Sequence, residues 1–142
     1  MIQIICGQKG KGKTKILLDH VNKAVKEANG NLVYLDKSNQ HMFELHNRVR
    51  LINCTEYMIE NKDEFVGFIS GIISQDHDLE TIYLDSFLTI ATIARTDTKD
   101  LEMVFAKLNR LSEVFHVTII MSVSMNKEDL PESAYDKIMV AL

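Results

Sequence analysis

The stretch Gly7-Gln8-Lys9-Gly10-Lys11-Gly12-Lys13-Thr14 decides the fold, because it follows the G-x-x-x-x-G-K-T pattern of a phosphate-binding loop. The apolar run 2–6 before it is typical of a β-strand, and a helical pattern begins near Thr14. The glycines let backbone N–H groups turn toward a polyphosphate, and the start of the helix adds partial positive charge. Lys13 is expected to contact the β- and γ-phosphates, and the Thr14 hydroxyl to ligate Mg²⁺. We therefore predict that all eight residues bind a nucleotide.

Length and composition predict one domain over residues 1–142. The chain is 46% hydrophobic and 25% charged, as in ordinary globular proteins. Its net charge of −4 and the lack of a basic helix or arginine-rich arm argue against a nucleic-acid surface. The apolar start is short and leads directly into the glycine loop, so we expect no signal peptide, no membrane span and a cytoplasmic location. Cys6 and Cys54 form no metal or redox motif and are expected to be small buried side chains.

Strand-like and helix-like patterns alternate along the chain. This alternation predicts an α/β fold in which helices wrap a parallel sheet. Asn61-Lys62-Asp63-Glu64 resembles a capping box, and Asp97 or Thr98 is expected to cap the most clearly periodic helix. The predicted strands are 2–6, 32–36, 49–53, 81–85, 117–122 and 137–142, and the predicted helices are 14–28, 38–47 (a weak pattern), 61–74 and 97–115.

A second chemical signal is the run Thr81-Ile82-Tyr83-Leu84-Asp85, a strand that ends on a carboxylate. Such an aspartate suits the Mg²⁺ shell beside the threonine of a phosphate loop. The strand 32–36 also ends on a carboxylate, Asp36, and competes for this role. We favour Asp85 as the residue at the Mg²⁺ ion, together with Thr14.

The arrangement resembles the RecA-like branch of P-loop NTPases, which includes RecA, RadA, KaiC and the cores of replicative helicases. In that branch the strand with the metal-shell aspartate typically ends in Asp-Ser, as Asp85-Ser86 does. A mobile segment, a long helix and an apolar strand that closes on a polar sensor then follow, and residues 95–100, 101–115 and 117–122 are similar to these parts. The resemblance implies a mainly parallel six-stranded sheet in the order 3-2-4-5-1-6. It also implies Mg-ATP as ligand, ATP hydrolysis, and Ser122 or Ser124 as the sensor.

The chain departs from that family at the catalytic base. A glutamate usually follows the second strand or the metal-shell aspartate, but here those places hold Asp36-Lys37-Ser38 and Ser86. Asp36 is the substitute candidate, with Lys13 as the other catalytic residue. Loss of a general base costs a factor of about 10² to 10⁴ in rate. We therefore expect either a slow ATPase, which a neighbour in a homo-oligomer or another protein partner could complete, or a nucleotide-binding switch.

Two other function classes share single features with this sequence. Corrinoid adenosyltransferases carry a loop similar to Gly10–Thr14, so a small transferase or kinase is an alternative. The run 126–129 matches the base-reading Asn-Lys-x-Asp of GTPases, but the Asp-x-x-Gly that usually accompanies it is missing. The five histidines show no metal-ligand spacing and are expected to be solvated or capping residues. Arg95 is expected to be solvated as well.

Overall fold

The sheet has six parallel strands in the order β3-β2-β4-β5-β1-β6. The computed structural model describes residues 1–142. Its strands are β1 (Ile2–Cys6), β2 (Asn31–Asp36), β3 (Val49–Asn53), β4 (Leu79–Leu84), β5 (Thr118–Val123) and β6 (Ile138–Ala141). This confirms the predicted α/β class and strand order. Because all the strands are parallel, their carboxyl ends meet along one edge of the sheet, where the turn after β1 also lies.

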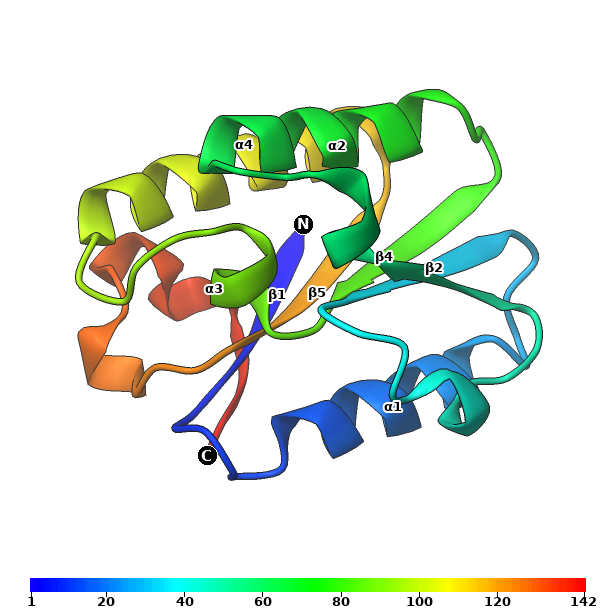
Figure 1. The fold of residues 1–142 in the computed structure, drawn as a ribbon, viewed down its shortest axis with the longest axis horizontal. Coiled ribbons are helices and arrows are strands. Elements are labelled where there is room, and N and C mark those ends of the chain that lie inside the picture. Colours follow the sequence, from blue (N-terminus) through cyan, green and yellow to red (C-terminus); the bar gives the residue numbers. More distant parts are fainter.

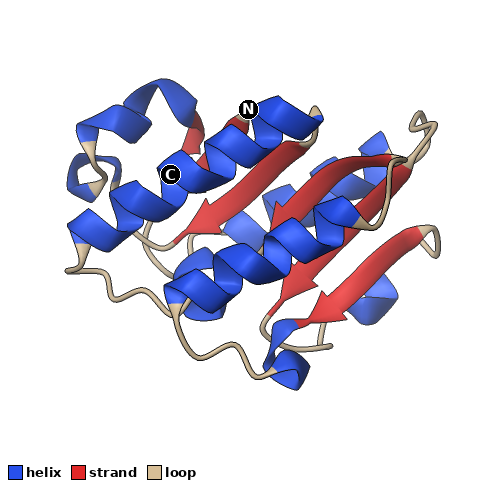
Figure 2. Ribbon diagram, turned by 90° about the horizontal axis from the view of Figure 1, so that it is seen from above, coloured by secondary structure: helices blue, strands red, loops and turns tan.

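Helices cover both faces of the sheet (Figure 1). Helix α1 (Lys13–Ala24) lies on one face, and α2 (Lys62–Ser74) and α4 (Thr98–Phe115) lie on the other. Seen from above, the two long helices lie side by side and run along the direction of the strands (Figure 2). The larger apolar cluster, of 28 buried residues, joins the sheet to α2, α4 and the short helix α3 (Phe87–Ile90). A smaller cluster of 10 buried residues joins it to α1.

Side-chain caps fix the beginnings of the two long helices. The Asn61 carboxamide oxygen accepts a hydrogen bond from the backbone N–H of Glu64 at 2.9 Å, and the Glu64 carboxylate accepts one from the N–H of Glu60 at 2.7 Å. In a capping box the glutamate side chain accepts a hydrogen bond from the N–H of the cap residue itself. Here the Glu64 carboxylate instead accepts from the N–H of Glu60, the residue before the cap. Asp97 caps α4 in the same way through the N–H of Asp100. Both predicted helix starts are confirmed.

Three local predictions were wrong. The segment 38–47 is not a helix: only Met42–Glu44 forms a single 3₁₀ turn, between bends and loops. Helix α1 ends at Ala24 rather than Ala28 and is followed by a turn. Helix α3 was not expected, because its four residues form one turn and cannot show helical periodicity. It begins after Ser86, whose backbone is left-handed with φ 56°.

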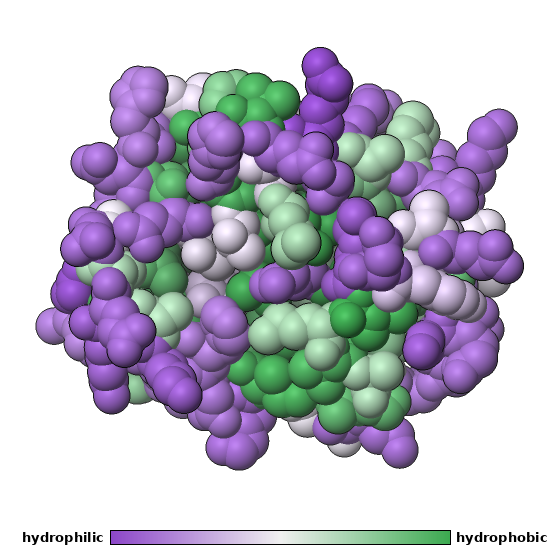
Figure 3. Space-filling view, turned by 180° about the vertical axis from the view of Figure 1, so that it is seen from behind, coloured by the Kyte–Doolittle hydropathy of each residue, from purple (hydrophilic) through white to green (hydrophobic).

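The surface is mainly polar. The side opposite to Figure 1 is largely hydrophilic, and its largest green area lies in the lower part, on the α1 side of the sheet (Figure 3). Strand β6 is one edge of the sheet, and Met139 within it and Leu142 after it are both exposed. The two cysteines, Cys6 and Cys54, have free thiols and are buried, as predicted. Cys6 is the last residue of β1, and Cys54 comes directly after β3. None of the helices combines the length and apolar composition needed to cross a bilayer.

Candidate functional site

The loop 7–14 joins the carboxyl end of β1 to the start of α1, as the sequence predicts. Gly10 and Gly12 have φ values of 86° and 92°, in the left-handed region that favours glycine. Gly12 directly precedes the first helical residue, Lys13. Gly7 is needed for space, because a Cβ atom there would lie 3.0 Å from the Cβ of Leu142. The glycines therefore allow both the turn of the loop and its close approach to the end of the sheet.

The Lys13 ammonium group folds back over this loop. Its Nζ atom donates hydrogen bonds to the carbonyl oxygens of Gly7 at 2.8 Å and Gln8 at 2.9 Å, and the residue is only 7% exposed. Burial lowers the pKa of Lys13, and the nearby Asp85 carboxylate opposes this shift. A buried cation held only by carbonyl dipoles is well placed to interact with an anion that enters the loop.

Asp85 follows β4 and accepts hydrogen bonds from three hydroxyl groups. Its Oδ1 accepts from Thr14 Oγ1 at 3.1 Å and from Ser122 Oγ at 2.9 Å, and its Oδ2 accepts from the Tyr34 hydroxyl at 2.8 Å. These donors come from α1, β5 and β2. Burial, followed by the Asp85 charge, raises the pKa of Tyr34, so the phenol remains a donor. Ser122 also accepts a bond from the N–H of Ser86, which ties the turn after β4 to β5.

Asp36 ends β2, the strand beside β4, and is equally buried at 2% exposed. Its Oδ1 accepts a bond from the N–H of Lys37 at 2.7 Å, but its Oδ2 is buried with no hydrogen-bond partner. Burial, and secondarily the charge of Asp85, raises the pKa of Asp36. Of the two aspartates weighed for the Mg²⁺ ion, Asp85 is the one hydrogen-bonded to Thr14.

These groups open into one cavity of about 930 Å³. Five of the eight predicted loop residues line it, whereas Gly7, Gln8 and Lys11 do not. Ser122 and Ser124 are both in the wall, so the cavity alone does not choose between them as sensor. The far wall is α3 and the loop after it. The polar and charged side chains in the cavity wall include Lys9, Lys13, Thr14, Asp36, Lys37, Gln40, His41, Asp85, Thr89, Thr92 and Arg95.

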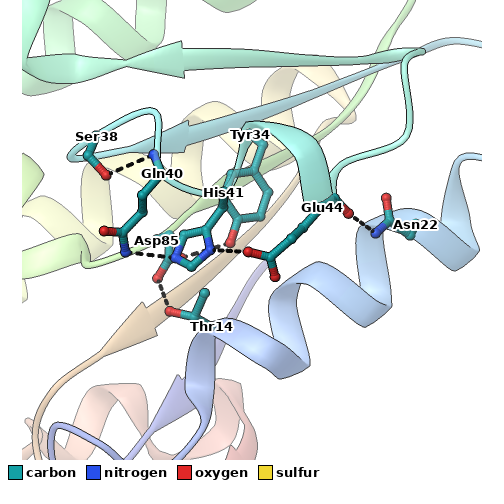
Figure 4. Close-up of polar contacts among 8 residues, drawn as sticks. All are labelled: Thr14, Asn22, Tyr34, Ser38, Gln40, His41, Glu44 and Asp85. Atoms are coloured by element: carbon teal, nitrogen blue, oxygen red, sulfur yellow. Dashed lines mark hydrogen bonds and ion pairs between the residues drawn. The ribbon is translucent and has the colours of Figure 1, made fainter.

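The sequence did not place two of the wall residues, Arg95 and His41, at the site. The Arg95 guanidinium was expected to be solvated; although exposed, it donates to the Gln8 carboxamide oxygen at 3.3 Å and so reaches the loop from the opposite wall. His41 was expected to be solvated or capping, yet it lies in the cavity wall near both aspartates. Figure 4 shows its ring among Gln40, Glu44 and Asp85. No sequence motif marks these residues, because the loop after β2 brings His41 to the site and the loop between α3 and α4 brings Arg95 there.

No model of a protein family matches this chain, and no curated protein matches its sequence. The fold is compatible with a P-loop NTPase. Any assignment of function therefore depends on the site itself.

Proposed function

We propose that this protein is a P-loop NTPase of RecA-like architecture that binds Mg-ATP through residues 7–14 and hydrolyses it slowly. The observation that carries the proposal is the convergence of Lys13, Thr14 and Asp85 on one cavity, at a strand–loop–helix junction with the required glycines. If the loop pattern matched by chance, there would be no reason for Lys13 to be buried or for the Thr14 hydroxyl to donate a hydrogen bond to the Asp85 carboxylate.

Phosphate binding would exchange contacts that are already in place. The Lys13 ammonium would leave the carbonyl oxygens of Gly7 and Gln8 for phosphate oxygens, which are charged acceptors and form stronger hydrogen bonds. The N–H groups at the start of α1 have no partner within the helix and would donate to the same anion. Lys9 and Arg95 add positive charge at the two sides of the cavity.

The residues present also fit a Mg²⁺ ion. Thr14 offers a hydroxyl oxygen and Asp85 a buried carboxylate beside it, and magnesium prefers oxygen ligands of this kind. A bound Mg²⁺ would neutralise phosphate charge during phosphoryl transfer. The part played by this chain is to hold the Thr14 hydroxyl in place through Asp85, which Ser122 and Tyr34 orient in turn.

We expect slow turnover because of the residue that occupies the place of the catalytic general base. Asp36 is the carboxylate at the place where RecA-like enzymes carry a glutamate, and its buried Oδ2 has no hydrogen-bond partner in the protein. Burial raises the pKa of Asp36, which does not weaken it as a base. The slow rate is expected because aspartate is one methylene shorter than the glutamate it replaces and reaches less far toward the attacking water. We expect a rate well below about 10 s⁻¹, the median for enzymes.

Calorimetry with Mg-ATP and Mg-GTP tests the proposal. Lys13→Ala removes a charge-assisted contact of about 1.5–3 kcal/mol, so ATP affinity should fall roughly 10- to 100-fold. Lys15→Ala is the matched control, because Lys15 lies two residues further on α1 with its side chain 80% exposed. Unchanged affinity in folded Lys13→Ala would contradict the proposal. Specific activity that rises with protein concentration would support completion of the site in an oligomer, and a flat low value a binding switch.

A small transferase or kinase is the second candidate. The observation that favours it is the extent of the cavity, which continues past the phosphate loop to Thr89, Thr92 and Arg95 and has room for an acceptor molecule. Phosphate release measured without any acceptor separates the two candidates. A hydrolase releases phosphate under these conditions, whereas a transferase binds ATP and leaves it intact.

A further inference from the structure

A cluster of metal-ligating side chains lies in the cavity beside the phosphate loop. Asp36, His41 and Asp85 each offer one ligand atom, and these three atoms lie within 4.8 Å of one another. The three residues come from the end of β2, the loop that follows it, and the end of β4. Parallel neighbours β2 and β4 bring the two carboxylates together, and the chain returning toward β3 adds the imidazole. The cluster is therefore built by three separate segments.

The unpartnered oxygen of Asp36 points to a ligand that completes this cluster. Asp36 is 2% exposed, and its Oδ2 has neither a hydrogen-bond donor nor solvent. A buried acceptor without a partner destabilises the folded state, and more so when it is charged. Asp85 nearby adds a second buried carboxylate, so negative charge accumulates at one place. A cation would satisfy the open oxygen and neutralise both groups.

His41 is oriented as a metal-binding histidine is. Its Nδ1 lies 2.9 Å from Glu44 Oε1, and its Nε2 lies 2.9 Å from the Gln40 amide nitrogen (Figure 4). A carboxylate only accepts and an amide NH₂ only donates, so Nδ1 carries the proton and Nε2 presents a lone pair. A carboxylate on the far nitrogen is the usual support of a metal-ligating imidazole. Asn22 of α1 steadies this support by donating to the Glu44 carbonyl at 2.7 Å.

Asp85 retains the capacity to bind a metal ion. Its Oδ1 accepts two hydrogen bonds, but its Oδ2 accepts only the one from Tyr34, so one lone pair of Oδ2 remains. A metal at about 2.0–2.2 Å from each ligand requires ligand atoms roughly 3 Å apart. The loop that carries His41 must therefore close inward slightly, and the ion must displace the Gln40 amide from Nε2.

We infer that Asp36, His41 and Asp85 bind one first-row transition-metal dication, of the class of Mn²⁺, Co²⁺ or Zn²⁺. The imidazole sets the class, because Mg²⁺ favours all-oxygen coordination whereas these ions accept nitrogen and carboxylate ligands together. The site lies on the β2 side of Asp85, away from the Thr14 hydroxyl at which Mg²⁺ is proposed. It needs no nucleotide, so it stands or fails independently of the proposed function.

Cobalt titration of chelator-treated, nucleotide-free protein tests the inference. We expect one Co²⁺ per chain, with visible absorption bands and with binding much tighter than that of Mg²⁺. His41→Ala and Asp36→Asn should each weaken Co²⁺ binding at least about 10-fold, and Glu44→Gln, which acts through the imidazole, should weaken it less. His77→Ala is the matched control, because His77 is exposed in the turn before β4.

Three outcomes would overturn the inference. The first is that the wild-type protein does not bind Co²⁺, and the second is that His41→Ala and wild-type protein bind it with equal affinity. The third is loss of Co²⁺ binding in Thr14→Val together with retention in His41→Ala, since this would locate the ion at the phosphate loop. Circular dichroism checks that each variant is folded. ATP calorimetry on Lys13→Ala gives a separate readout for the nucleotide site.

Discussion

Replacing the buried carboxylate at the centre of the site, Asp85→Asn, should remove the magnesium dependence of nucleotide binding. The carboxylate accepts three hydroxyl hydrogen bonds at 2.8–3.1 Å. Bonds to a charged group are worth about 1.5–3 kcal/mol and neutral ones about 1 kcal/mol, so the asparagine holds the Thr14 hydroxyl more weakly. The variant also lacks the negative charge of the metal shell. A loss of about 1.5–3 kcal/mol corresponds to roughly 10- to 100-fold weaker Mg-ATP binding.

The assay compares ATP affinity with Mg²⁺ and with a chelator in wild-type protein, Asp85→Asn and Asp36→Asn. In Asp85→Asn the affinity with Mg²⁺ should fall toward the chelator value, while the metal-free affinity stays nearly constant. Thermal unfolding is the control for folding. Loss of the charge also relieves repulsion from Asp36, so stability should change much less than Mg-ATP affinity. If Asp36→Asn lost the Mg²⁺ effect and Asp85→Asn kept it, our assignment of the two aspartates would be reversed.

Three further predictions concern stability and reactivity. Burial raises the pKa of Asp36 above 3.8, so the folded state holds this proton more tightly and stability falls as pH rises through the raised pKa. Without metal, Asp36→Asn should therefore melt at a higher temperature than wild type at pH 7, and the gap should close toward pH 4; a constant gap would refute this. Cys6 and Cys54 should not react with a thiol reagent at pH 8 until the protein is denatured, because both are buried and burial raises the pKa of Cys54 to about 12. Labelling of native protein would contradict their burial. Asn61→Ala should cost about 1 kcal/mol in urea unfolding because α2 loses its cap, and Asn61→Asp should retain most of the stability.

The strands and long helices could be predicted because their patterns are local and strong. Strand β3 has the predicted bounds, and Asn61 and Asp97 cap the helices they were expected to cap. The helix predicted for the segment 38–47 was wrong for a physical reason. Its conformation depends on long-range partners, such as Asn22, which donates to the Glu44 carbonyl and accepts from the N–H of His46. No periodicity within the segment records those bonds.

The residues of the candidate site likewise fall into some that could be predicted from the sequence and others that could not. Residues 7–14 carry a fixed spacing and could be predicted as one unit. Asp85 could be predicted because it comes directly after a strand-like run of residues. His41 and Arg95 reach the cavity from two different loops, and the buried Tyr34 supports Asp85 from β2; none of the three has a sequence pattern of its own. The sequence already favoured Asp85 over Asp36, and the hydrogen bond from Thr14, which joins residues 71 positions apart, supports that preference. The role of Asp85 at Mg²⁺ stays a prediction.

These separations along the chain have a consequence for folding. The three hydroxyls on Asp85 lie 71, 51 and 37 residues away from it in sequence. Contacts of such range close large loops and form only as the sheet assembles, so a fragment that contains residues 7–14 but lacks β4 and β5 cannot hold the site. Under the proposed function, the nucleotide would therefore bind the native state alone. At a ligand concentration 100 times Kd, the whole molecule gains about 2.7 kcal/mol against unfolding. Under the proposed function, nucleotide supply would thus raise the fraction of chains that are folded at equilibrium.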